Sequence, residues 1–114
     1  MLNSGDVVYV ELGTPIGREA GYRHPAVLVT AQRLLDATPS VVQVVPLTTT
    51  LRGFGSEVLI EADGPNGLEK TSSAQCQHVR AVATARLSDR LGNVGITSLA
   101  QIRDVLGLIL DVPA

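Results

Sequence analysis

Cysteine is nearly absent from the 114-residue chain, and so are tryptophan and long apolar runs. A single cysteine, Cys76, cannot form an internal disulfide, which fits a reducing compartment and predicts a cytoplasmic protein. No stretch of about 18 apolar residues is present, so we predict no membrane-spanning helix and no membrane partner. Residues 1–6 also lack the charged start and apolar stretch of a signal peptide.

An excess of positive charge is missing as well. Nine lysine and arginine residues stand against eleven aspartate and glutamate residues, giving a formal net charge of −2. That balance excludes a broad basic surface, so any site for an anion must be local, and no direct DNA binding is expected. The charged fraction of 18% and the hydrophobic fraction of 45% exclude a disordered chain. The length fits a single domain over residues 1–114.

Metal-binding and phosphate-binding motifs are also missing. The chain has no paired-cysteine zinc pattern, no His-x-x-x-His and no cluster of carboxylates with metal spacing. Its two histidines, His24 and His78, lie far apart in the sequence. No glycine run matches a phosphate-binding loop, and no serine lies in a nucleophile elbow. We therefore expect no metal and no cofactor, and we disfavour a metal-dependent nuclease, a nucleotide hydrolase and a serine hydrolase.

Short segments rich in β-branched residues dominate what is present. They are separated by glycine, proline and other turn residues, as is typical of strands, and the clearest turn is DGPNG at residues 63–67. Residues 31–40 could form one short helical turn. Strands are expected at residues 6–12, 25–30, 41–47, 57–61, 72–82 and 91–96.

One amphipathic helix is expected near the C-terminus. Ser98 and Gln101 have the spacing of a capping box at its start. A series of strands followed by one helix predicts a mainly β fold, either a small, strongly bent sheet or an open barrel, rather than alternating βαβ units. The apolar residues that recur at helical spacing are Leu99, Ile102, Leu106 and Ile109.

Cationic, hydroxyl and aromatic side chains gather in two glycine-rich loops, residues 13–23 and 48–56. Guanidinium and hydroxyl donors that face each other can bind phosphate, and an aromatic ring beside arginine can stack on a single-stranded base. Both loops follow apolar strands, so a rigid sheet can bring them together. The residues concerned are Arg18, Tyr22, Arg23 and His24 on or just past the first loop, and Thr48, Thr49, Thr50, Arg52 and Phe54 on the second.

Three stretches of the chain resemble the signatures of the MazF/PemK toxins. The first is Gly17-x-Glu19 followed by RHPAVLV at residues 23–29. The second is VPLTT at residues 45–49, continued by RGF at 52–54 and by EV at 57–58. Residues 72–87 resemble the strand that the family places after its acidic turn, and the C-terminal helix falls where the family has its own. The likeness covers nearly the whole chain in order and spacing.

The resemblance implies a small SH3-like barrel of the CcdB/PemK/MazF type that forms a homodimer. It implies cleavage of single-stranded RNA (mRNA) without metal, through 2′-OH attack that leaves a 2′,3′-cyclic phosphate. It also implies control by a cognate, MazE-like antitoxin whose disordered segment docks on the dimer. In family members, an arginine before the proline of the first signature assists the phosphoryl chemistry. Its usual partner is the first threonine or serine of the second signature, here Thr48.

Histidine replaces that arginine in this chain. The residue before Pro25 is His24, and the arginine stands one position earlier as Arg23. Three explanations compete: the His24 imidazole performs acid–base chemistry, Arg23 supplies the cation, or the protein is weakly active or inactive. Adjacent strand residues point to opposite faces, so only one of the pair easily faces the site. His78 stands where the family usually has glutamine and is expected to be structural or interfacial, and no convincing second proton carrier is found.

The candidate site therefore has two groups of residues. The candidate catalytic residues are His24, Arg23 and Thr48. The candidate RNA-binding residues are Arg18, Glu19, Tyr22, Thr49, Arg52 and Phe54.

Two alternatives remain beside an RNA-cleaving toxin. One is a weakly active or inactive family member that binds only RNA or antitoxin. The other is a CcdB-like gyrase poison, which would not need the loop signatures.

Overall fold

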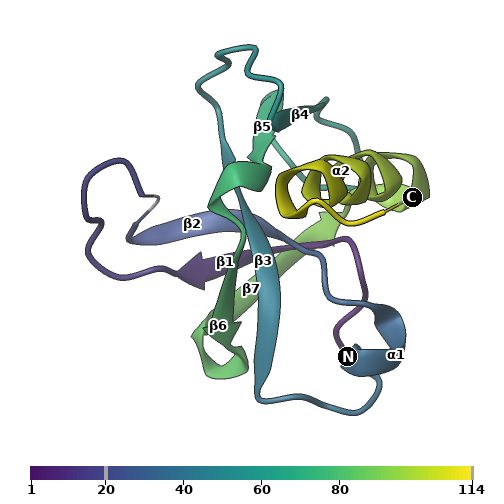
Figure 1. Ribbon diagram of the computed structural model, residues 1–114. Coiled ribbons are helices and arrows are strands. Elements are labelled where there is room, and N and C mark those ends of the chain that lie inside the picture. Colours follow the sequence, from purple (N-terminus) through teal and green to yellow (C-terminus); the bar gives the residue numbers. More distant parts are fainter. Residues whose placement is uncertain (20, 114) are drawn as a thin grey trace.

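Seven strands and two α-helices make up the part of the chain that the computed structural model describes, residues 1–19 and 21–113. The strands predicted at 6–12, 25–30, 41–47 and 57–61 are confirmed to within two residues at each end. In chain order, the elements are β1 (Asp6–Glu11), β2 (Arg23–Leu28), α1 (Gln32–Leu35), β3 (Val41–Thr48), β4 (Glu57–Ile60), β5 (Ser72–Gln75), the 3₁₀ turn η1 (Cys76–His78), β6 (Arg80–Ala83), the 3₁₀ turn η2 (Thr84–Arg86), β7 (Leu87–Asn93) and α2 (Gly95–Leu110) (Figure 1).

The sheet is antiparallel, with strand order β4-β5-β3-β2-β1-β7 and with β6 paired to β3 beside this path. The first half of β3 pairs with β6, where Val44 lies opposite Arg80. The end of β3 pairs with β5 instead, where Thr48 lies opposite Ser73. Because β3 changes partner along its length, the sheet bends around it into an open, barrel-like fold (Figure 1). The predicted mainly β fold with one C-terminal amphipathic helix is confirmed.

Two apolar clusters form the core, one on each face of the central strands. Alternate residues of each strand enter different clusters because strand side chains alternate between the two faces. Both faces of β3 are thus covered from Val44 to Leu47, where the sequence has no polar side chain, whereas Val41 and Gln43 at the start of the strand are exposed. One cluster includes Val10, Leu28 and Val44, and the other includes Val7, Val27 and Leu47 together with Leu99 and Ile102 of α2.

The single strand predicted for residues 72–82 is wrong. The chain forms β5, then η1, then β6. Cys76, at the start of η1, is fully buried, and its Sγ atom lies 4.0 Å from the carbonyl oxygen of Ile102 in α2. This burial raises the pKa of the Cys76 thiol to about 11, so the side chain is an unreactive part of the core. Leu47 of β3 lies opposite Ala74, and Val44, three residues earlier, lies opposite Arg80. The facing chain therefore advances six residues where a continuous strand would advance three, and η1 takes up the three extra residues.

The last strand and the start of the helix also differ from the prediction. β7 spans Leu87–Asn93 rather than 91–96, and α2 begins at Gly95, before the predicted cap at Ser98. No side chain caps α2 in the predicted manner; its first residue instead donates its backbone N–H to Asn93 Oδ1 at 2.8 Å. The capping-box pattern therefore lies inside the first turns of the helix rather than at its boundary.

The buried part of α2 is shorter than the predicted apolar stripe. Leu99 and Ile102 are buried, whereas Ile109 is 41% exposed. Among the residues that the structure describes, neither helix combines the length and the apolar character of a membrane span.

Candidate active site

The register between β2 and β3 decides which candidate residues share a face. Ala26 lies opposite Pro46, and Leu28 lies opposite Val44. Continued to the strand ends, this register places His24 across from Thr48 and Arg23 across from Thr49. Directly paired residues of an antiparallel sheet point to the same face, and neighbours along a strand point to opposite faces. His24 and Thr48 therefore share one face, and Arg23 and Thr49 share the other.

The ring of His24 is half-buried and has a fixed orientation. Its Nδ1 atom lies 3.1 Å from the carbonyl oxygen of Leu47. A carbonyl oxygen can only accept a hydrogen bond, so Nδ1 carries the proton in this contact. The neutral imidazole then has its free lone pair on Nε2, which makes Nε2 the atom of His24 that can accept a proton.

The Thr48 hydroxyl is held at the end of β3. Thr48 Oγ1 accepts a hydrogen bond of 3.1 Å from the backbone N–H of Thr50. The hydroxyl proton is not used in that bond and can be donated to a ligand. Ser73 lies opposite Thr48 on β5, and Glu57 lies on the same face of the next strand, β4. One face thus carries a row of polar groups across four strands.

A buried carboxylate, which sequence reasoning missed, ends this row. The side chain of Glu57 is only 1% exposed. Its oxygens accept hydrogen bonds from Arg52 Nη2 at 2.5 Å, Gln77 Nε2 at 2.7 Å and Ser73 Oγ at 2.9 Å. Burial, the largest single influence, raises the pKa of Glu57, but the three donors and the Arg52 charge together outweigh it. The pKa of Glu57 is therefore lowered from 4.5, and the group is anionic near neutral pH.

Glu57 holds a cationic and aromatic surface in place. The Arg52 guanidinium, fixed by Glu57, lies 4.9 Å from the ring centroid of Phe54. Three of the predicted RNA-binding residues therefore meet at one pocket, together with a histidine expected to be structural. This pocket has a volume of about 440 Å³ and is lined by Arg18, Arg52, Phe54, Ser56, Gln77 and His78.

Glu19 and Tyr22 come from the loop between β1 and β2. Glu19 lines a pocket of about 270 Å³ that shares Gln77 and His78 with the pocket around Arg52. The side chain of Tyr22 is 64% exposed. Its backbone carbonyl oxygen accepts a hydrogen bond of 2.7 Å from the Leu12 N–H, which joins the two ends of the loop.

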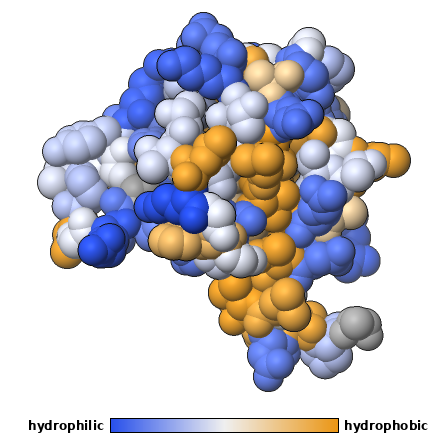
Figure 2. Space-filling model, turned by 90° about the horizontal axis from the view of Figure 1, so that it is seen from above, coloured by the Kyte–Doolittle hydropathy of each residue, from blue (hydrophilic) through white to orange (hydrophobic). Residues whose placement is uncertain are grey.

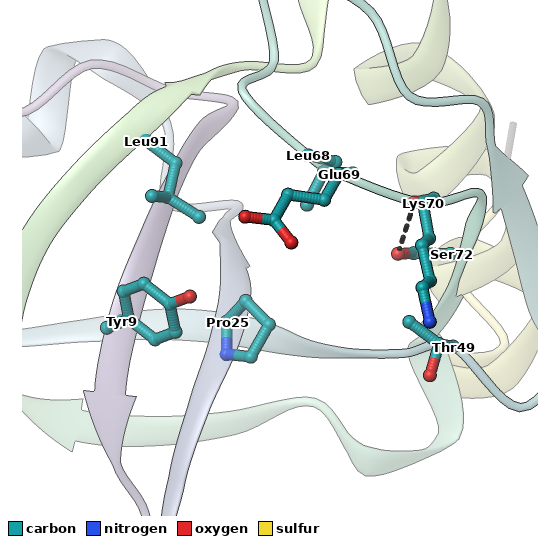
Figure 3. Close-up of a pocket in the computed structure, with 8 residues that line it drawn as sticks. All are labelled: Tyr9, Pro25, Thr49, Leu68, Glu69, Lys70, Ser72 and Leu91. Atoms are coloured by element: carbon teal, nitrogen blue, oxygen red, sulfur yellow. Dashed lines mark hydrogen bonds between the residues drawn. The ribbon is translucent and has the colours of Figure 1, made fainter.

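Arg23 lies on the opposite face from His24. Its guanidinium carbon is 3.9 Å from the ring centroid of Tyr9, and Nη2 is 3.3 Å from Asp89 Oδ2. Thr49 is directed to the same side and lines a pocket of about 320 Å³ (Figure 3). The structure therefore brings His24 and Thr48 together and separates Arg23 and Thr49 from them. No three His, Cys, Asp or Glu side chains of residues 1–19 and 21–113 gather as metal ligands would.

Comparison with known proteins identifies the family. Residues 3–110 match the model of the PemK-like, MazF-like toxin of type II toxin–antitoxin systems. The chain is 34% identical over 118 residues to endoribonuclease MazF9 of Mycobacterium tuberculosis (strain ATCC 25618 / H37Rv), covering 98% of each chain. It is 26% identical over 86 residues to endoribonuclease MazF3 of the same species, covering 75% of this chain and 82% of the relative.

Solved structures share the fold. A MazF from Deinococcus radiodurans superposes with a TM-score of 0.81 at 23% identity, covering 97% of each chain. An endoribonuclease in complex with its cognate antitoxin, from a mycobacterial species, superposes with a TM-score of 0.79 at 22% identity, covering 100% of this chain and 99% of that one. Taken with the family match over nearly its full length, the chain belongs to the PemK-like, MazF-like toxins of type II toxin–antitoxin systems.

Proposed function

We propose that this protein is a toxin endoribonuclease that cleaves single-stranded RNA. The observation that carries the proposal is the pairing of the His24 imidazole, oriented through Nδ1 with Nε2 free, with the Thr48 hydroxyl on one face of the sheet. The family match and a relative named an endoribonuclease, 34% identical over nearly the whole chain, support it.

The proposed reaction is an internal transesterification. His24 Nε2 removes the proton of a ribose 2′-OH, whose oxygen attacks the adjacent phosphorus. The bond from phosphorus to the 5′ oxygen breaks, leaving a 2′,3′-cyclic phosphate on one fragment and a 5′-OH on the other. Thr48 donates its hydroxyl proton to a non-bridging phosphate oxygen, which stabilises the charge that develops on the phosphorane.

The departing 5′ oxygen needs a proton, and His78 is the group that supplies it. This half-buried imidazole lines the same pocket as Arg18, Arg52 and Phe54. His78 is the last residue of η1, which links β5 and β6, and both of these strands pair with β3. His24 lies on β2, which pairs with the other edge of β3, so the two histidines flank this strand. With His24 as base and His78 as acid, the proton of the 2′-OH and the proton of the departing 5′ oxygen each have a carrier.

No step in this scheme needs a metal ion, which gives a direct test. Purified protein is incubated with a long single-stranded RNA in EDTA, and the ends of the products are identified. Fragments that end in 2′,3′-cyclic phosphate support the proposal. Intact RNA together with tight binding of a MazE-like antitoxin would instead identify an inactive family member.

The proposed assembly is a homodimer that a MazE-like antitoxin neutralises. Apolar surface gathers in one band on the face of the molecule seen in Figure 2. At and beyond the end of α2, Leu108 is 79% exposed, Leu110 is 62% exposed and Val112 is 59% exposed. A second copy that covers this apolar surface explains its exposure in the single chain. Sedimentation equilibrium tests this: the wild-type protein is a dimer, and Leu108→Asp shifts it toward monomer.

A further inference from the structure

The pocket that Thr49 lines is on the face opposite His24, in the angle between the segment from β4 to β5 and the strands β1, β2 and β7 (Figure 3). Its volume of about 320 Å³ is at the lower end of the range of small-ligand sites and suits one nucleobase-sized group. The proposed reaction uses none of its side chains. The pocket is lined by Tyr9, Pro25, Thr49, Leu68, Glu69, Lys70, Ser72 and Leu91.

The wall that carries Glu69 and Lys70 is preformed. Asn66, just before it, is 1% exposed, and its Oδ1 accepts bonds from the N–H of Asp63 at 3.1 Å and of Leu68 at 2.9 Å. The next residue, Gly67, has a φ of 69° and lies so close to the backbone carbonyl of Leu91 that a Cβ atom would collide with it. These contacts fix the segment against β7, so the pocket needs little rearrangement to bind a ligand.

The chemistry of the lining is that of a site for a flat, hydrogen-bonding group. Tyr9 and Pro25 form one apolar wall and Leu91 another, and the Glu69 carboxylate points between them (Figure 3). The Lys70 ammonium lies beside Thr49 at the other end. Neither Glu69 nor Lys70 forms an ion pair with another residue of the described chain. An ionised carboxylate only accepts hydrogen bonds, so its ligand must present donors.

We propose that this pocket binds a guanine base of the RNA strand, a subsite that rests on the proposed function. Guanine presents two neighbouring donors, N1–H and the exocyclic amine, which match the two oxygens of Glu69 in a bidentate contact. Adenine and cytosine present only an amine to a carboxylate, and uracil presents one N–H between two carbonyl oxygens that the carboxylate repels. Tyr9 and Pro25 contact the face of the base, and Lys70 contacts its phosphate.

The position of the pocket relates it to the proposed cleavage site. Thr48 and Thr49 are consecutive, as are Arg23 and His24, so the two sites lie back to back across one layer of sheet. Single-stranded RNA that bends over the ends of β2 and β3 reaches both. The guanine therefore stands at a fixed, short distance in sequence from the bond that is cut, and its recognition contributes to the cleavage motif.

Direct binding of mononucleotides tests the subsite without any need for cleavage. Guanosine monophosphate, titrated into isotope-labelled protein and followed by NMR, shifts the backbone amide signals of residues 68–72 and of Leu91. The adenosine, cytidine and uridine monophosphates bind more weakly. Glu69→Gln weakens guanosine monophosphate binding about tenfold or more, the usual size for a charged hydrogen bond. Lys70→Ala weakens the nucleotide but leaves guanosine unchanged.

The matched control is Glu61→Gln, an exposed carboxylate of the same segment that does not line the pocket. It leaves binding unchanged, and thermal unfolding verifies that every variant is folded. Equal binding of uridine and guanosine monophosphates, or binding that Glu69→Gln leaves intact, overturns the proposal. So do amide shifts at the pocket that arise only with an arginine-containing peptide, because the site is then a protein-docking site.

Cleavage mapping separates this proposal from the proposed function. Sequencing the fragments of a random RNA pool shows enrichment of guanine at one fixed position near the cut, and Glu69→Gln reduces this enrichment while Glu61→Gln does not. RNA that is cut with no guanine preference, and no binding of guanosine monophosphate, rejects the subsite and leaves the nuclease standing. Glu69-dependent nucleotide binding without RNA cleavage rejects the nuclease and leaves the subsite standing.

Discussion

The two faces of the sheet at the ends of β2 and β3 hold similar residue types in different settings. On one face, His24 is half-buried and oriented by the Leu47 carbonyl, beside Thr48. On the other, Arg23 is exposed, stacked on Tyr9 and paired with Asp89. Residues adjacent in sequence are thus separated by a full layer of sheet. A cation adjacent in sequence to His24 can therefore lie too far from Thr48, on the other face of the sheet, to act beside that hydroxyl.

The largest expected effect is the loss of the His24 imidazole. His24→Ala removes the proposed base and reduces the rate of RNA cleavage about 10²- to 10⁴-fold, the usual contribution of general base catalysis. Single-turnover cleavage of a labelled oligonucleotide measures it. Circular dichroism provides the control. We expect the variant to be folded, because His24 is only half-buried and lies near the end of its strand. A variant that is folded and fully active would remove His24 from the mechanism.

Replacing the Thr48 hydroxyl comes next. Thr48→Val keeps the β-branched shape that suits a strand and removes the donor to the phosphate, so cleavage slows about 10- to 100-fold, as for one hydrogen bond to a charged group. The matched variant on the opposite face, Thr49→Val, removes a hydroxyl that the proposed reaction does not use, so at saturating protein, where weaker RNA binding does not affect the rate, it slows cleavage less than Thr48→Val. Equal losses in both variants would show that the two faces do not differ in the reaction.

The buried and exposed ion pairs of the two faces differ in their effect on stability. Glu57→Gln replaces a carboxylate that accepts three hydrogen bonds with a neutral amide. We expect this change to lower the free energy of unfolding by about 1–3 kcal/mol near neutral pH. Because the pKa of Glu57 is lowered from 4.5, its contribution is fully present above that pH and is lost as the pH falls through the lowered value. Urea denaturation at a series of pH values measures it. A loss of stability independent of pH would contradict the assigned ionisation.

The smallest effect is expected at the exposed pair. The side chains of Arg23 and Asp89 are 53% and 80% exposed, so Asp89→Asn changes the free energy of unfolding by less than about 1 kcal/mol. Added salt reduces even this difference. The same urea experiment checks it, and an effect as large as that of Glu57→Gln would mean that Arg23 has a structural role as strong as the buried network.

Much of the fold could be predicted from local patterns. The β-branched run of β1 and the Asp63 to Gly67 turn are recognisable within a few residues of sequence, and both occur where expected. The break at Cys76 could not be predicted, because the segment continues a strand-like pattern on both sides. Its cause is the change of partner along β3, which depends on residues distant in sequence.

The candidate site was predictable only where local sequence patterns decide it, and not where contacts between distant residues do. Strand alternation predicts that only one of Arg23 and His24 faces Thr48, but which one depends on the register of β2 with β3. Glu57 was missed because its three donors lie 5, 16 and 20 residues away in the chain. An arginine five residues before a carboxylate at the start of an apolar strand was the one local signal.

We expect His24, and not Arg23, to take part in RNA cleavage. The most direct test is the ratio of single-turnover cleavage rates of Arg23→Ala and His24→Ala, measured side by side on one single-stranded RNA in EDTA. The expected result is that Arg23→Ala cleaves within a few-fold of the wild-type rate and at least about 100 times faster than His24→Ala. A ratio of one or less would contradict this expectation and would mean that Arg23 contributes to cleavage at least as much as His24.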